Sequence, residues 1–468
     1  MSPVTEQLEE PPERRATAWG IRPVPAALRR LRSLDLAVLW GDLSIGLLVL
    51  VSGALLVPAL GLPRALLAIV VGSLIGCLPL AFVGLAGARE GVPGMVLFRP
   101  VLGRRGSYVP SAINLVQLVG WTAFEFWAMG RVANAVGGDL LGLEAPVVWM
   151  AIVAVVCTAL AIAGPVFAVR RWLERFGAWV VAAAALWITA RVLAVGDLGA
   201  VWRAPGTGGL PFWLAVDLVI AMPVSWLPLV ADFNRFARSP RGAFAGTFWS
   251  YAAGNAWFYA LGALLVLAAG AGADVLDIGT TIAATAGGAV VLLVLLAGES
   301  DQAMANIYSS AVSIQNVRPE VRQRPLILGV GALGFAIALA IGDHAAGTFE
   351  SFLFLIGSVF VPLFGVFLAE WGVIWRGRFG EAALFDEAVP GLRWRAVIPW
   401  VTGFAVYQWC VPLGPAWWTG AVERAVTALG LPFPLFGGSW GASLPAFAVA
   451  FVLALVVGRA PGTRLNPR

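Results

Sequence analysis

Polar side chains that could bind a planar ligand follow one face of a predicted helix. They are Asn114, Gln117, Trp121 and Glu125, spaced three, four and four residues apart. An indole ring can stack on a planar ligand, and a carboxylate one turn away can exchange hydrogen bonds with ring nitrogens. The alternative is that Trp121 packs against a helix and Glu125 is paired with a neighbour. The stripe as a whole favours a binding site.

The segment LLVLLAGESDQAMANIYSS (292–310) places further polar groups inside an apolar run. Ala297, Ser300 and Asp301 share a helical face, and a backbone carbonyl, a hydroxyl and a carboxylate together suit Na⁺, or a proton held on Asp301. A neighbouring face carries Glu299, Gln302 and Asn306. We predict a helix that serves a cation on one face and a polar ligand on the other. A polar seam between helices is the alternative.

Other acids also interrupt apolar runs. An aspartate at the centre of a membrane helix costs about 2.5–3.5 kcal/mol on insertion scales, so such residues tend to face cavities and to be functional. Asp42 and Asp217 occupy positions of this kind. Asp35, Asp232 and Glu370 are close to the ends of runs, which predicts interfacial positions for them.

The composition predicts an all-α polytopic membrane protein with twelve transmembrane helices. Of the 468 residues, 60% are hydrophobic and 12% are charged, whereas about a quarter of the residues in a soluble domain are charged. The single histidine, His344, is predicted to be solvated, and the three cysteines indicate neither a metal cluster nor a disulfide framework. The predicted spans are 34–60, 63–88, 108–137, 146–169, 172–194, 209–234, 243–270, 281–315, 325–342, 346–375, 394–416 and 434–458.

The distribution of basic residues predicts the orientation. The chain has 31 arginines and no lysine, and 26 of them fall on the side that would hold both tails. The positive-inside rule then predicts a multi-pass protein of the plasma membrane with cytoplasmic N- and C-termini. The arginines are explained by topology and anionic lipid, so no nucleic-acid partner is expected.

Two sets of five spans that start on opposite sides predict an inverted repeat. Each set begins with an interrupted helix, LWGDLSIG (39–46) in the first and AMPVSWLP (221–228) in the second. The predicted organisation is a tail 1–33, a repeat 34–194, a second repeat 209–375, a helix pair 394–458 and a tail 459–468.

Three stretches of the chain carry a resemblance to a known family. They are GRRGSYVPSAINLVQLVGW (103–121), PVSWLPLVADFNRFAR (223–238) and SDQAMANIYSSAVSIQN (300–316). These stretches resemble the entry into span 3, the span 6 signature and the span 8 segment of the nucleobase–cation symporters, also called purine–cytosine permeases. The resemblance covers about residues 35–380.

The resemblance implies a LeuT-like core of five plus five helices, two additional C-terminal helices, and import of heterocyclic bases with Na⁺ or H⁺. The substrate site that it implies, together with the polar stripes, consists of Gln117, Trp121, Glu125, Pro223, Ser225, Trp226, Gln302 and Asn306. The cation site consists of Asp42, Ser44, Ala297, Ser300 and Asp301. The family often has an uncharged residue in place of Glu125 and a hydroxyl residue in place of Asp301, and its span 6 stacking position falls here on Pro223.

We therefore expect a secondary active transporter that imports cytosine or another purine or pyrimidine nucleobase together with Na⁺ or H⁺. It is expected to need no bound cofactor and to function as a monomer. MPVSWLPL (222–229) also resembles a subgroup linked to hydroxymethylpyrimidine, which is the alternative substrate. An intramembrane enzyme would need a nucleophile–base pair or a metal cluster, and a channel would need a continuous polar pore; the sequence indicates neither.

Overall fold

The computed structural model describes residues 20–164, 177–341, 345–386 and 390–458. The predicted position of His344, most of the N-terminal tail and the whole C-terminal tail lie outside the described residues. Within the described ranges the chain is helical, and its one pairing of extended backbone is an isolated bridge between Leu31 and Ala237. The all-α prediction is confirmed.

One group of helices contains both interrupted helices. It consists of α3 (Ser33–Asp42), α4 (Leu47–Ala54), α5 (Leu62–Glu90), α13 (Phe212–Ser225), α14 (Val230–Asn234) and α15 (Pro240–Ala269). The long helix α15 packs against α5, α3 and α4, while α13 and α14 pack on α5. The halves of each interrupted helix therefore belong to one packed unit.

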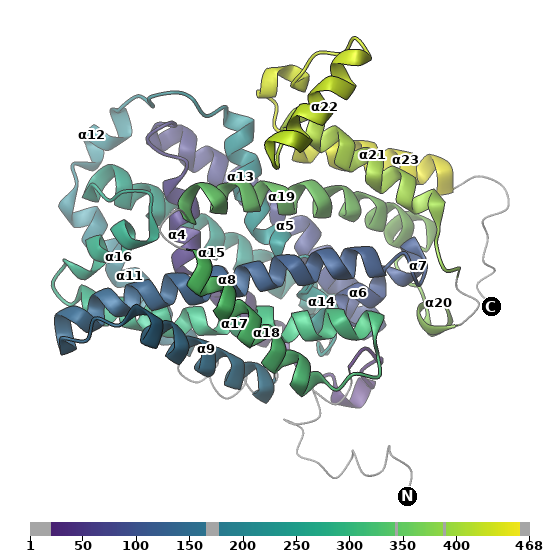
Figure 1. Cartoon of the computed structure of the whole chain (residues 1–468), viewed down its shortest axis with the longest axis horizontal. Coiled ribbons are helices and arrows are strands. Elements are labelled where there is room, and N and C mark those ends of the chain that lie inside the picture. Colours follow the sequence, from purple (N-terminus) through teal and green to yellow (C-terminus); the bar gives the residue numbers. More distant parts are fainter. Residues whose placement is uncertain (1–19, 165–176, 342–344, 387–389, 459–468) are drawn as a thin grey trace, which may run out of the picture.

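A second group is built from the helices that carry the two polar stripes. It consists of α8 (Tyr108–Leu141), α9 (Pro146–Ala163), α17 (Gly288–Val317) and α18 (Gln323–Ile341). Each of these four helices packs against the other three. Figure 1 shows α8 crossing the middle of the molecule, with α17 and α18 beside it.

The remaining elements cover the two groups. The longer ones are α11 (Ala178–Val195), α16 (Val275–Ala283), α19 (Ala345–Phe367) with a π-helical continuation to Ile374, α21 (Trp394–Cys410), α22 (Ala416–Ala428) and α23 (Ser443–Gly458). The short ones are η1 (Ala26–Leu28), α6 (Gly94–Leu97), α7 (Arg99–Leu102), α12 (Leu198–Arg203), α20 (Glu381–Phe385) and η4 (Leu435–Gly438). Helices α21 and α23 pack against α19, and α22 stands at the upper edge of Figure 1.

Length and apolar composition of the helices identify fewer membrane spans than the twelve predicted from the sequence. Among the described helices, eight are long and apolar enough to cross a membrane, and the bent pair α3–α4 brings the number to nine if it is one span. Helix α8, which carries the polar stripe, is not among them, and α21 and α23 are short, with 17 and 16 residues. The total of twelve spans stays a prediction.

Both predicted interruptions are present. Helix α3 ends at Asp42 and α4 begins at Leu47, with an angle of 59° between them. Helix α13 ends at Ser225, and α14 begins at Val230 after one irregular turn. Proline lacks a backbone donor and glycine weakens a helix, so Gly41 and Gly46 at the first interruption and Pro228 at the second favour a break there.

Glycines bring the backbones of α4 and α15 into contact. A Cβ atom at Gly262 of α15 would collide with the carbonyl oxygen of Leu50 in α4. A Cβ atom at Gly254 would collide with the hydroxyl of Ser44, in the interruption that precedes α4. Small residues at such crossings allow helices to approach closely in a membrane, where van der Waals packing drives association.

Candidate functional site

The polar stripe of α8 is buried, as its helical spacing predicts, and it faces two other elements. The Asn114 amide donates to the Ser313 hydroxyl of α17 over 2.8 Å. The Gln117 amide donates to the Asn114 side chain over 2.7 Å and to the Ser225 carbonyl over 3.0 Å. Helix α8 is therefore connected both to α17 and to the end of α13. The Oε1 atom of Gln117 is buried without a hydrogen-bond partner.

Glu125 of α8 meets Asn306 of α17. The Asn306 amide donates to both carboxylate oxygens of Glu125, over 2.9 and 3.1 Å. The two side chains are 1% and 2% exposed. The sequence predicted that both residues would contact one ligand, and the structure brings them into direct contact with each other.

Trp121 lies one turn from Glu125 and contacts aromatic side chains of α19. The ring centroids of Phe349 and Phe352 are 5.7 and 5.3 Å from that of Trp121, in edge-on geometry. The indole Nε1 is buried and has no acceptor. Sequence spacing did not identify Phe349 and Phe352, because aromatic residues in an apolar run carry no polar signal.

The predicted span 6 residues have separate surroundings. Ser225 presents its carbonyl to Gln117, while its hydroxyl donates to the Met222 carbonyl within α13. Trp226 packs edge-on against Trp40 of α3, with a centroid distance of 6.1 Å. The Pro223 ring lies against Gly76 of α5. Of the three residues, Ser225 is the one with a hydrogen bond to the α8 stripe.

Three further acids gather where the first interruption faces α17. The carboxylate of Asp42 lies within electrostatic range of Asp301 and Glu299. Asp301 is 1% exposed, and neither of its carboxylate oxygens has a hydrogen-bond partner; Oδ2 of Asp42 also lacks one. Nearly all buried polar groups in proteins are hydrogen-bonded, so this set of buried oxygens requires an explanation.

Side chains of α17 bind the interrupted backbone directly. The Glu299 Oε2 atom accepts the backbone N–H of Leu47, the first residue of α4, over 2.9 Å. The Gln302 amide donates to the Ile45 carbonyl over 3.3 Å. Gln302, which was predicted to contact the substrate, is therefore engaged at the interruption, and the capping role of Glu299 was not predicted.

The residues of the predicted cation face of α17 differ in their exposure. Asp301 is buried, whereas Ser300 is half-buried and Ala297 is exposed. The Ser300 hydroxyl donates to the Leu296 carbonyl of its own helix over 3.3 Å, and the Ser44 hydroxyl donates to the Gly41 carbonyl over 2.6 Å. Across the described ranges, no group of three or more His, Cys, Asp or Glu side chains is arranged to hold a metal ion.

Asp217 has a structural partner at a distance from the polar stripes. Its carboxylate accepts the backbone N–H groups of Ala442 and Ser443, where α23 begins. A carboxylate at a helix N-terminus satisfies donors that have no partner within the helix. Asp217 therefore joins α13 to α23, and its burial is explained by this cap.

The three acids that were predicted to be interfacial are buried within the protein. Asp35, Asp232 and Glu370 are 1%, 2% and 1% exposed. The interfacial interpretation overlooked partners such as the Gly94 N–H, which donates to Asp232 over 2.9 Å, and Arg393, which lies 3.5 Å from Glu370. These two partners belong to other elements, so the sequence alone does not reveal them. The partner of Asp35 is local, because Arg32 lies 3.0 Å away and three residues earlier.

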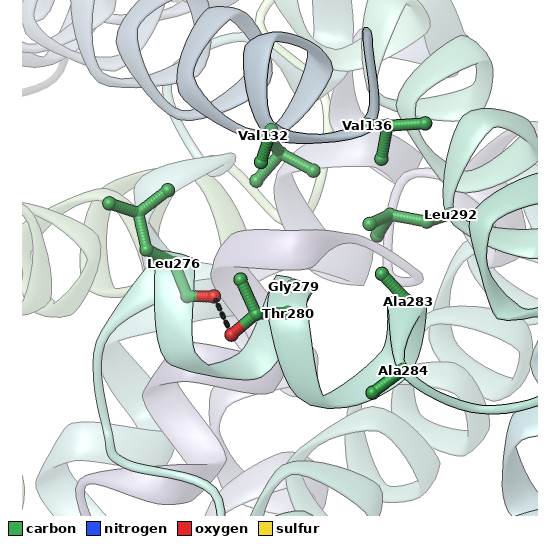
Figure 2. A pocket seen from close by; sticks show the side chains of 9 residues that line it. Val132, Val136, Leu276, Gly279, Thr280, Ala283, Ala284 and Leu292 are labelled. Carbon is green, nitrogen blue, oxygen red and sulfur yellow. Dashed lines mark hydrogen bonds between the residues drawn. The ribbon is translucent and has the colours of Figure 1, made fainter. Parts of the chain in front are cut away.

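An apolar pocket of about 160 Å³ lies between α8, α16 and α17, beyond Glu125 along α8. Figure 2 shows Val132 and Val136 of α8 facing α16 across it. The hydroxyl of Thr280 donates to the Leu276 carbonyl over 2.8 Å, so this polar group is already satisfied. The pocket is thus lined mainly by apolar side chains, in contrast to the acid-rich region around Asp42, Asp301 and Glu299.

Comparison with known proteins identifies the family. A family model described as "Permease for cytosine/purines, uracil, thiamine, allantoin" matches residues 23–430. The chain belongs to this family. The resemblance to nucleobase–cation symporters that the sequence indicated is confirmed. Members of the family are permeases, so this chain is a multi-pass membrane transporter for heterocyclic compounds and not an enzyme.

Individual permeases of the family are similar over most of the chain. The hydantoin permease of Microbacterium maritypicum is 24% identical over 82% of this chain and 81% of its own length. The cytosine permease of Escherichia coli strain K12 is 25% identical over 75% of this chain and 79% of its own length.

The fold of this permease is that of a solved nucleobase–cation symporter. MHP1 in a closed conformation with bromovinylhydantoin bound has a TM-score of 0.76 and covers 94% of each chain, at 18% sequence identity. The predicted LeuT-like fold of a polytopic membrane transporter is thereby confirmed.

Proposed function

We propose that this permease imports a small purine- or pyrimidine-like base by symport with a cation, Na⁺ or H⁺. The observation that carries the proposal is a pair of buried, unsatisfied atoms one turn apart on α8, the Nε1 donor of Trp121 and the Oε1 acceptor of Gln117. A planar base that carries both donors and acceptors would complete their hydrogen bonds. It would lie beside the carboxylate of Glu125 and the amide of Asn306.

The chemistry of the surrounding groups supports a heterocyclic ligand. Trp121 offers an aromatic surface at the edge of a cluster formed with Phe349 and Phe352. The names of the two relatives support a compact ring with several N–H and C=O groups, since one is a hydantoin permease and the other a cytosine permease. Cytosine and other nucleobases fit this description.

The carboxylates near the first interruption support coupling to a cation. Asp42 and Asp301 are buried within electrostatic range of each other and have oxygens without partners. Two buried carboxylates repel each other when both are charged, so a positive ion or a proton between them stabilises the arrangement. Either ion would connect α17 to the interrupted helix that ends at Asp42. Binding of the ion would thereby favour the conformation that binds the base.

The two interrupted helices support transport by alternating access. In inverted-repeat transporters, substrate and ion sites lie near the middle of the membrane, at helices of this kind. Here Ser225 at the second interruption is bonded to α8, and Leu47 at the first is bonded to α17. A ligand held between these helices would contact both groups, so it could stabilise one arrangement of the groups over another.

The proposal is tested by uptake of radiolabelled bases into proteoliposomes that contain the purified protein. We expect saturable uptake of at least one nucleobase, accelerated by an inward gradient of Na⁺ or H⁺, and exchange of internal for external base when the gradient is absent. Uptake that ignores both gradients would disprove the coupling. Flux that never saturates would disprove a carrier and indicate a channel.

A further inference from the structure

Glu299 binds the interrupted helix with one carboxylate oxygen and leaves the other without a partner. Its Oε2 atom accepts the Leu47 N–H over 2.9 Å, whereas its Oε1 atom is buried and makes no hydrogen bond. The side chain is 1% exposed. This second oxygen, buried beside the start of α4, is an acceptor that a ligand could use.

The backbone at the interruption allows this close approach. Gly46 is extended, and a Cβ atom at this position would lie 2.7 Å from Glu299 Oε2 and would collide with the Gln302 amide. The first N–H groups of a helix have no partner within the helix, and the helix dipole gives this end positive character. Such an end attracts anions. In this chain, a carboxylate of α17 already occupies the start of α4.

A second acid increases the negative character of the same region. Glu125 lies within electrostatic range of Glu299, and among the described residues its oxygens accept hydrogen bonds from Asn306 alone. No arginine in the described part of the chain forms an ion pair with either acid. An arriving ligand therefore meets acceptors at Glu125 and Glu299, and no positive side chain is paired with them.

We infer that Glu299 determines which substrate charge the permease accepts. Its carboxylate already occupies the anion-binding end of α4, so the permease rejects anionic heterocycles. It selects neutral or cationic heterocycles that are rich in N–H donors. The inference rests on the proposed function, since it concerns the ligand of the same site. An anionic ligand would add a negative charge beside two carboxylates in a region of low dielectric constant. A neutral ligand with amino groups would instead donate to the free oxygen of Glu299.

The test uses equilibrium binding to the full-length protein in detergent, with two probes of equal size. These are uracil-6-carboxylate, which is anionic, and uracil-6-carboxamide, which is neutral. We expect the wild type to bind the amide at least about tenfold more tightly, the size of effect expected for one charge at a partly buried helix N-terminus. Uracil and cytosine serve as small neutral reference ligands.

Variants of Glu299 separate charge from structure. Glu299→Gln keeps an acceptor for Leu47 but removes the charge, so the ratio of amide to carboxylate affinity should fall to about one-tenth of the wild-type ratio. Glu299→Asp keeps the charge and should keep the rejection of the carboxylate. Thr280→Val removes a hydroxyl that bonds within α16, away from this interruption, and should leave the ratio unchanged.

Each result decides the inference. Equal affinities of the wild type for the two probes would overturn the inference even if the variants did not fold. Binding of uracil or cytosine with exclusion of both probes would also overturn it, because it would indicate rejection by size. An equal loss of affinity for both probes in Glu299→Gln would show a structural role only. A wild type that binds none of the probes, uracil and cytosine included, would instead disprove the proposed function.

Discussion

The two interrupted helices, which the sequence predicts to open matching repeats, are completed by different chemistry. At the first interruption, α17 supplies a carboxylate to the Leu47 N–H and an amide to the Ile45 carbonyl. At the second, the Ser225 hydroxyl bonds within its own helix and α8 supplies the neutral amide of Gln117. The first interruption is acidic and the second is neutral.

The difference teaches that two interruptions with different backbone geometry, a 59° bend in the first and a single turn in the second, can be completed by different side chains. Unpaired carboxylate oxygens gather at the first interruption, on Asp42, Asp301 and Glu299. Buried carboxylates are costly unless they are paired or hydrogen-bonded, and these oxygens are the ones for which we propose an ion and a ligand. The second interruption is completed by neutral hydrogen bonds, which fix the position of α13 against α8. We expect substitutions on the acidic side to have the larger effects.

The largest effect is expected for Glu125→Ala, on the acidic side. It leaves the amide of Asn306 without its acceptor and removes a hydrogen-bonding group for the base, so affinity should fall about 100-fold. Binding of radiolabelled base to purified protein measures the loss. Glu125→Gln can still bond Asn306 and should lose less. If the alanine variant kept the wild-type affinity, the ligand would have to bind at another place in the protein.

Asp301→Asn should remove the dependence on the cation. The amide keeps the shape of the side chain but has no charge to be neutralised. In the wild type we expect a coupled ion to raise base affinity roughly tenfold, and in the variant this ratio of affinities with and without the ion should be about one. Titration of base binding with and without Na⁺, and at two pH values, measures this factor. If the factor persists, coupling belongs to Asp42 or to backbone oxygens.

A smaller effect is expected for Gln117→Ala, which breaks the contact between α8 and the neutral interruption. The variant removes the Oε1 acceptor proposed for the base, a single hydrogen bond worth about 1–1.5 kcal/mol, so affinity should fall about fivefold to tenfold. It also removes the bonds to Asn114 and to the Ser225 carbonyl, which hold α8 against α13. The same binding assay measures the change. A loss as large as that of Glu125→Ala would contradict the proposed division between the interruptions.

The smallest effect is expected for Ser225→Ala. The serine hydroxyl donates to a carbonyl three residues earlier in its own helix, and this local bond adds little to helix stability. Affinity should stay within about twofold of the wild type because the Ser225 carbonyl that accepts from Gln117 is unchanged. Thermal unfolding in detergent provides the control for folding.

Local patterns were sufficient to predict much of the fold and part of the site. Hydrophobic run length predicted the helices, and the spacing of Gln117, Trp121 and Glu125 correctly predicted one buried face. Glycine, proline and polar residues in mid-run predicted both interruptions. These features depend on residues within a few turns of one another, which is the range that sequence periodicity covers.

Contacts across the fold were beyond the reach of such patterns. Glu299 is 252 residues from Leu47, whose N–H it accepts, and Asp217 is 225 residues from Ala442. Each acid was recognised as unusual, but its partner depends on how distant helices pack. Helical spacing likewise grouped Ala297 with Asp301, although the structure exposes one and buries the other.

The glycines at the crossing of α4 and α15 limit where this protein can deform. Touching backbones leave no side chains that could change rotamer, so Gly262 and Leu50 cannot slide past each other without separating. Helices α4 and α15 should therefore tilt together as one rigid unit. We expect any hinge to lie between this pair of helices and α17, where hydrogen bonds such as that from Leu47 to Glu299 can open and re-form.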